Sequence, residues 1–146
     1  MGSYASALAK ILHDAHDEQP GRSCYCGLTG CIETYLSGPS LVRNHKLNTN
    51  QSLATNEIAD QANRGIQESE ATFARYEHRL ARKLSNLINF LDPDIIVLGG
   101  GISNIERLYK NVPRIWEQWI VSDYRDTQLV KSKHGDSSGV RGAAWL

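Results

Sequence analysis

The sequence predicts an α/β fold, and two observations carry that prediction. Residues 41–91 repeat apolar side chains at steps of three to four, which is the period of helices with one buried face. Residues 94–146 then alternate strand-like and helix-like segments. Their first segment, 95–98, is a continuous apolar run, as expected of a strand covered on both faces of a parallel sheet. Helices together with such a strand indicate an α/β domain.

Composition narrows the class of protein. The chain has 146 residues, enough for one domain with a real core. Its formal net charge is zero, which gives no indication of a nucleic-acid partner or an anionic membrane surface. It has no apolar run near the roughly 20 residues that span a bilayer. Residues 1–4 lack the features of a signal peptide. We therefore expect a cytoplasmic protein that contacts neither membrane nor nucleic acid.

The first 40 residues divide into two segments. Residues 1–21 are mixed in character and end in the turn signal Pro20-Gly21, so we expect them to form a divergent N-terminal segment. Residues 22–40 contain three cysteines and several glycines. This segment predicts a tight loop followed by a short helix that begins near Ile32.

Two helices are predicted next, over 53–64 and from Gly65 to the residue before Asp92-Pro93. The second has an apolar face made of Phe73, Leu80, Leu84, Leu87, Ile88 and Leu91. Charged residues fall mostly on its other side, which we expect to face solvent: Arg75, Glu77, Arg79 and Arg82. We also expect His45 and His78 at the surface.

The predicted strand 95–98 is followed by Gly99, Gly100 and Gly101 and then by a helix that Ser103 or Asn104 can cap. Trp116 and Trp119 on this helix are expected in the core or an interface. Residues 127–130 predict a weaker strand. Residues 135–139 read as a turn or helix cap, and 140–146 open a final helix.

Three cysteines lie within eight residues, in the pattern Cys24-x-Cys26-x4-Cys31. An odd number so closely spaced makes a poor disulfide framework. Zinc prefers four tetrahedral ligands and binds thiolates well, so the spacing predicts one structural zinc ion rather than three unrelated buried thiols. A histidine is the usual fourth ligand in such a set, and His13 and His16 are near in sequence. We take His16 as the candidate.

These residues also resemble a known family. The signature of the ROK family (repressors, open reading frames, sugar kinases) is matched by Cys24-x-Cys26-Gly27-x-x-Gly30-Cys31-x-Glu33-x-x-x-Ser37-Gly38. Residues 91–103 look like the family's adenosine-side strand and glycine turn. Residues 134–146 are similar to bacterial fructokinases of the manno(fructo)kinase type. The resemblance covers about residues 22–146.

The resemblance implies the C-terminal lobe of an actin-like, ribonuclease-H-like ATPase fold, with the zinc loop at 22–40, helices at 41–91 and a nucleotide-side α/β part at 94–146. Family members phosphorylate a hexose with ATP and Mg²⁺, and fructose is the expected sugar here. By position, Glu33 would contact sugar hydroxyls, and the Gly99–Gly101 turn would lie against the nucleotide. Without the family, Glu33 reads as a first-turn carboxylate and the glycines as a plain strand-to-helix turn.

The chain also departs from the family pattern. It contains neither the Asp-x-Gly-Gly-Thr phosphate loop nor the catalytic aspartate, so we assign no catalytic residue and expect no kinase activity from this chain alone. The family's zinc histidine would fall within the first few residues, which hold none. His16 is therefore a ligand by proximity only, and solvent or another chain could serve instead. The alternatives are a non-catalytic zinc-binding module that forms a homodimer, or a fragment of a ROK-type regulator.

Overall fold

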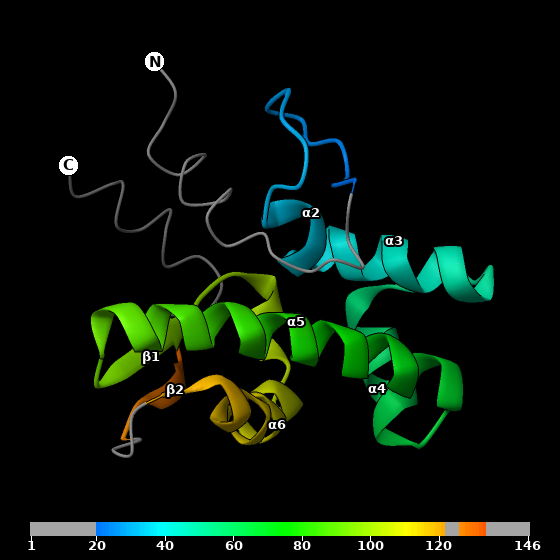
Figure 1. Ribbon diagram of the computed structural model, residues 1–146. Helices are drawn as coiled ribbons and strands as arrows, with labels where there is room; N and C mark the ends of the chain where they lie inside the picture. The colour runs from blue at the N-terminus through cyan, green and yellow to red at the C-terminus, as the bar shows by residue number, and fades with distance from the viewer. Residues whose placement is uncertain (1–19, 122–125, 134–146) are drawn as a thin grey trace.

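The computed structural model describes residues 20–121 and 126–133. The first half of this part is helical: α2 (Glu33–Leu36), α3 (Gly38–Thr49), α4 (Thr55–Asn63) and the long α5 (Gln67–Leu91). The second half contains β1 (Ile95–Leu98), the 3₁₀ helix η2 (Gly101–Asn104), α6 (Arg107–Trp116), the 3₁₀ helix η3 (Glu117–Trp119) and β2 (Gln128–Lys131). Figure 1 shows α5 crossing the molecule, with α2 and α3 on one side and α6 on the other. The described fold is α/β, mostly helical with a small parallel sheet.

Helix α5 supplies the centre of the core. Its predicted apolar face is buried at Phe73, Leu80, Leu84 and Ile88, and α3, α4 and α6 pack against it. Leu91, which was predicted on the same face, is exposed at the end of the helix. The helix ends at Asp92, which adopts a left-handed conformation (φ 45°) while its N–H donates to the carbonyl of Ile88 at 2.8 Å. Pro93 follows and cannot continue the helix. The predicted end of this helix is therefore confirmed.

Two predictions about polar residues are wrong. His45 lies on α3 with none of its surface exposed, because its ring packs against α5 and its Nδ1 lies 3.0 Å from the Thr72 hydroxyl. Glu77 on α5 is also buried rather than facing solvent. Its carboxylate has a charged partner, Arg107 of α6, whose Nε lies 2.6 Å from the Glu77 Oε1. Because both partners are distant in sequence, the local pattern did not reveal them.

Strands β1 and β2 pair in parallel, with Ile95 opposite Gln128 and Leu98 opposite Lys131. The alternate residues Ile96 and Leu98 pack against the core. The side chains of Ile95 and Val97 are 55% and 58% exposed. The expectation that this strand is covered on both faces is thus wrong for the described residues, where one face meets the helices and the other remains open.

The connection from β1 to α6 differs from the predicted capped helix. Gly101 begins a four-residue 3₁₀ helix, and the Ser103 hydroxyl donates to the carbonyl of Gly100 at 2.7 Å instead of capping α6. The prediction for the tryptophans is confirmed. Trp116 is buried, and Trp119 packs against the core with its ring edge-to-face with the exposed His78 at 4.9 Å.

The predicted features at 135–139 and 140–146 lie outside the described residues, as does all but the end of segment 1–21. Within the described part, no helix combines the length and the apolar character that a membrane crossing requires.

Candidate functional site

The three cysteines lie on a small closed loop that precedes α2. Ser23 and Thr29 form an antiparallel bridge across it, and the Cys24 N–H donates to the carbonyl of Leu28 at 2.8 Å. Gly27 turns the loop with φ 82°, a conformation that residues with a Cβ rarely adopt. The backbone thus folds the predicted tight loop and brings Cys31 back towards Cys24 and Cys26.

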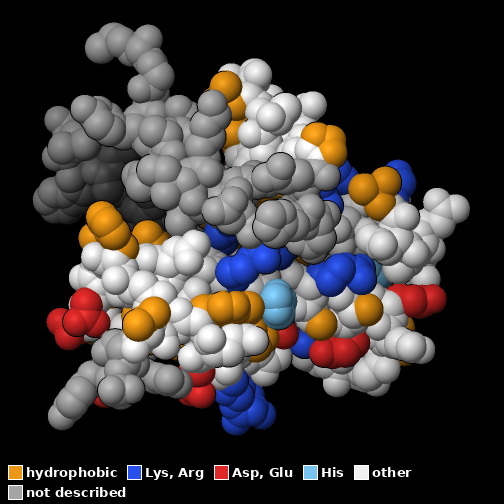
Figure 2. Space-filling view, in the orientation of Figure 1, with side chains coloured by type: hydrophobic (Ala, Val, Ile, Leu, Met, Phe, Trp, Pro, Cys, Tyr) orange, Lys and Arg blue, Asp and Glu red, His pale blue; other side chains and the backbone are white. Residues whose placement is uncertain are grey.

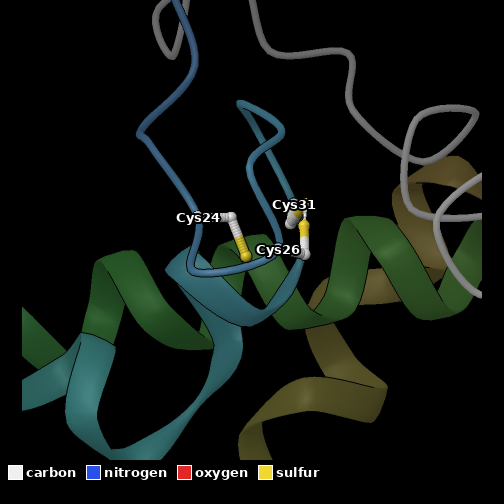
Figure 3. A group of neighbouring side chains, drawn as sticks. All are labelled: Cys24, Cys26 and Cys31. Carbon is white, nitrogen blue, oxygen red and sulfur yellow. Dashed lines mark hydrogen bonds between the residues drawn. The ribbon is translucent and has the colours of Figure 1, made fainter.

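The sulfur atoms converge, as Figure 3 shows. All three lie within 4.8 Å of one another, and the Sγ atoms of Cys26 and Cys31 are 3.5 Å apart. Four sulfurs held tetrahedrally at 2.3 Å from zinc would be separated by about 3.8 Å. The spacing of the three thiols therefore fits a zinc ion. The candidate fourth ligand His16, like His13, lies outside the described residues.

Neighbouring thiols change the pKa values of Cys26 and Cys31. A hydrogen bond from the Leu28 backbone lowers the pKa of Cys26, and the neighbouring thiols Cys31 and Cys24 add to that effect. The same Cys26–Cys31 hydrogen bond, followed by burial, raises the pKa of Cys31 to about 12. One sulfur thus gains thiolate character while its neighbour keeps a proton. A divalent cation can displace such shared protons, since metal ions bind the deprotonated form.

Glu33 begins the short helix α2, immediately after the cysteine loop, and its side chain is exposed. Burial raises the pKa of Tyr76 on α5, and the negative charge of Glu33 adds to this increase. The Tyr76 hydroxyl donates to the carbonyl of Leu36 at 2.8 Å. Helix α2 therefore begins with an exposed carboxylate two residues after Cys31, and its last residue is tied to α5.

Sequence reasoning missed the residues that support the loop. Arg22 contacts both the loop and α2, and Thr34 and Tyr35 on α2 are its partners there. The Thr34 hydroxyl also donates to the carbonyl of Cys31 at 2.6 Å. The nearness of an arginine to the first cysteine was the only available signal, and it does not specify a partner.

The glycine turn is built apart from the cysteine loop, directly after β1. Gly100 has φ 75°, so this position favours glycine. A Cβ added at Gly99, Gly100 or Gly101 would meet no atom within 4 Å. The turn is therefore open to close approach by a ligand. The helix that follows it is only the four-residue η2, so the expected helix N-terminus is absent at this position.

Comparison with known proteins gives consistent matches. The sequence model of the ROK family matches residues 8–146. An N-acetyl-D-glucosamine kinase from Yersinia enterocolitica is 40% identical over 127 residues, which are 87% of this chain and 42% of that protein. An N-acetyl-D-glucosamine kinase from Vibrio atlanticus is 35% identical over 130 residues, 89% of this chain and 43% of that protein. The chain thus spans less than half the length of these curated relatives.

Solved structures agree with the fold. A ROK family glucokinase from Streptomyces griseus, solved with glucose and AMPPNP, superposes with a TM-score of 0.75 at 25% identity, over 86% of this chain and 47% of that one. A ROK hexokinase from Thermus thermophilus gives 0.71 at 25% identity, over 86% and 44%. A ROK family transcriptional regulator gives 0.65 at 20% identity, over 82% and 33%, which supports the fold alone.

Proposed function

This chain belongs to the ROK family, and from that premise we propose that it forms the C-terminal part of an ATP-dependent sugar kinase. The observation that carries the proposal is the exposed carboxylate of Glu33, which begins α2 two residues after Cys31, the last residue of the three-sulfur cluster. A carboxylate accepts hydrogen bonds from the hydroxyls of a sugar, and charged acceptors form the stronger ones. The curated relatives, which match most of this chain, are named as kinases of a sugar.

The proposed substrate is an N-acetylated hexosamine, for which N-acetyl-D-glucosamine is the representative. Fructose, expected from residues 134–146, has no support among these relatives, which are named N-acetyl-D-glucosamine kinases at 35–40% identity. Glu33 does not itself discriminate between the two, because both sugars offer hydroxyl groups. The test must therefore compare the sugars directly.

We assign the residues the following roles. Cys24, Cys26 and Cys31, with His16 as the fourth ligand, hold one structural zinc ion that stabilises the loop next to Glu33. Glu33 binds and orients the sugar and does not act as the base. Gly99, Gly100 and Gly101 allow the nucleotide to approach the backbone.

Phosphoryl transfer also needs a general base for the sugar hydroxyl and groups that hold the phosphates of ATP with Mg²⁺. We assign neither role to a residue of this chain. The expected result is that the 146-residue chain alone does not phosphorylate N-acetyl-D-glucosamine or fructose in an assay coupled to ADP release. Turnover above background would contradict this.

A chimera tests the function itself. The C-terminal part of the Yersinia enterocolitica kinase is replaced by the matching residues of this chain, and kcat/KM is measured for both sugars. We expect activity with a preference for N-acetyl-D-glucosamine. In the chimera, Glu33→Gln should lower kcat/KM by about 10–100-fold, because the substitution removes a charged hydrogen-bond acceptor. Glu117→Gln, at an exposed glutamate on η3, is the control. A preference for fructose, or an unchanged Glu33→Gln variant, would refute the assignment.

Elemental analysis tests the metal. We expect one zinc per chain in protein purified without chelators, and none after Cys31→Ser. His16→Ala should weaken zinc binding if His16 is the fourth ligand. Purified chain that contains no zinc would contradict the metal site, and an unchanged His16→Ala variant would remove only that ligand.

A second candidate function is a zinc-binding module that pairs with a second copy of itself. The open face of β1, where Ile95 and Val97 are exposed, favours it, because apolar surface on a sheet promotes association. One protein can have both functions. Measuring the oligomeric state tests the self-association surface on β1 independently of the proposed sugar site.

A further inference from the structure

Arg22 lies at the base of the cysteine loop, where the chain enters and leaves it. Its carbonyl accepts a hydrogen bond from the Gly30 N–H at 2.8 Å, next to Cys31. Its own N–H donates to the Tyr35 hydroxyl at 3.1 Å. Its guanidinium Nη1 donates to the carbonyl of Thr34 at 3.2 Å. One residue therefore connects the start of the loop, its end and helix α2.

The aromatic ring of Tyr35 also contacts the Arg22 side chain. The Arg22 guanidinium carbon lies 4.8 Å from the centroid of the Tyr35 ring, and the Arg79 guanidinium carbon of α5 lies 5.5 Å from it. Both distances are within the range of cation–π attraction. Tyr35 is only 7% exposed, so these interactions occur in a partly desolvated setting where they are stronger. The tyrosine thus links the loop to α5.

We propose that Arg22 and Tyr35 are positioning residues for the zinc loop, which they hold closed and anchor to α5 through Arg79. The inference rests on the zinc site proposed above. All three sulfurs lie between Arg22 and α2 in the chain, so fixing the two ends of this segment reduces the conformational freedom that metal binding would otherwise have to remove. Residues that orient metal ligands in this way commonly change metal affinity 10–100-fold when substituted.

The experiment uses two substitutions with matched controls. Tyr35→Phe keeps the ring but removes the hydroxyl that accepts from Arg22. Arg22→Met keeps the length of the side chain but removes its charge and its hydrogen-bond donors. Tyr25→Phe, at a tyrosine of the same loop that is 92% exposed, and Arg43→Met, at an exposed arginine of α3, repeat the same chemistry away from these contacts.

The readout is the zinc dissociation constant of the full chain at pH 7, from competition with a chromophoric chelator, with far-UV circular dichroism to verify folding. We expect Arg22→Met to weaken zinc binding by about 10–100-fold and Tyr35→Phe by less, because the ring contacts remain. The two controls should match the wild type. Folded Arg22→Met and Tyr35→Phe variants that bind zinc as tightly as the wild type would overturn the inference alone. A wild-type chain that binds no zinc would overturn the metal site, and the inference with it.

The link to α5 has its own readout. Zinc should slow amide hydrogen exchange around Arg79 in the wild type and not in Arg22→Met. If Arg22 only stabilised the fold, Arg22→Met would lower the free energy of unfolding, but zinc would still slow exchange around Arg79 as it does in the wild type. Zinc that leaves exchange in α5 of the wild type unchanged would overturn the proposed anchoring.

Discussion

His45 lies fully inside the protein between α3 and α5. The Thr72 hydroxyl donates to the carbonyl of Glu68 at 3.0 Å, so its oxygen accepts the proton of His45 Nδ1 at the same distance. Nδ1 therefore carries the hydrogen, and the buried Nε2 has no hydrogen-bond partner among the described residues. Burial lowers the pKa of His45 and outweighs the opposing charge of Glu68, while Arg75 adds to the lowering. The folded protein keeps this ring neutral.

This neutral ring predicts sensitivity to acid. Above the unfolded pKa of about 6.5, both states hold His45 neutral and its contribution is fully present. Below that pH the unfolded chain takes up a proton that the folded state resists, so the free energy of unfolding falls. The slope for this one group is at most about 1.4 kcal/mol per pH unit. Urea unfolding between pH 7 and 5 should therefore show a shallower loss for His45→Gln than for the wild type.

The exposed His78 supplies the control for that measurement, as His78→Gln. Equal pH slopes for the wild type and His45→Gln would contradict the buried neutral ring. The sequence could not predict this residue, because His45 is flanked by Asn44 and Lys46 and shows no apolar pattern. Its partner Thr72 is 27 residues away.

An ionic network joins helices α5 and α6. Arg107 of α6 pairs with the buried Glu77 at 2.6 Å and with the half-exposed Glu70 at 2.7 Å. Asn111 donates to both Glu77 oxygens at 3.1 Å, and the Arg107 guanidinium lies over the Phe73 ring at 4.9 Å. These ion pairs hold the pKa of Glu70 below its usual value and raise that of Arg107.

The network predicts unequal roles for the two glutamates. Glu77→Gln should lower the free energy of unfolding by about 3 kcal/mol, because it removes the buried one of the two carboxylates that pair with Arg107 and leaves that guanidinium only the half-exposed Glu70. Glu70→Gln should cost less than about 1 kcal/mol, because the Glu70 side chain is 48% exposed and solvent screens its charge. Urea unfolding of both variants measures the difference. Equal losses would show that burial does not set the strength of these pairs.

At the level of elements, the sequence predicted what local periodicity determines. Helices expected over 53–64 and after Gly65 appear as α4 and α5, and the strands expected at 95–98 and 127–130 appear as β1 and β2 within one residue. The 3₁₀ helix η2 was missed, because three glycines in succession carry no period. Glu77 was misplaced because only a partner 30 residues away explains its burial.

At the scale of the molecule, the sheet is open on one face, and this predicts self-association. Size-exclusion chromatography with light scattering should give the mass of a dimer for the wild-type chain. The double variant Ile95→Thr/Val97→Thr should shift it towards a monomer, since threonine suits strands but lowers the apolar area. Leu47→Gln removes an apolar side chain of α3 that is even more exposed, at 73%, and should leave the dimer intact. A wild-type monomer at all concentrations would contradict the prediction.

Part of the candidate site could be predicted from short local patterns in the sequence. The spacing of Cys24, Cys26 and Cys31 indicated a shared centre, and the structure brings their sulfurs together. The position of Glu33 came from the family signature. Arg22 and Tyr35 were not predicted, because their contacts depend on the tertiary packing of the loop against α2 and α5. A short sequence motif does not specify such packing.

The parallel pairing of β1 with β2 also has a kinetic consequence. Ile95 pairs with Gln128, so the strands meet only after the intervening chain, including η2, α6 and η3, has been laid down. Closing so long a connection costs entropy before any strand hydrogen bond forms. The helices α3, α4 and α5, by contrast, are consecutive neighbours with local contacts. The helical half of the chain should therefore fold early and the sheet late. Ile95 and Val97 would then be among the last apolar residues to reach their native positions.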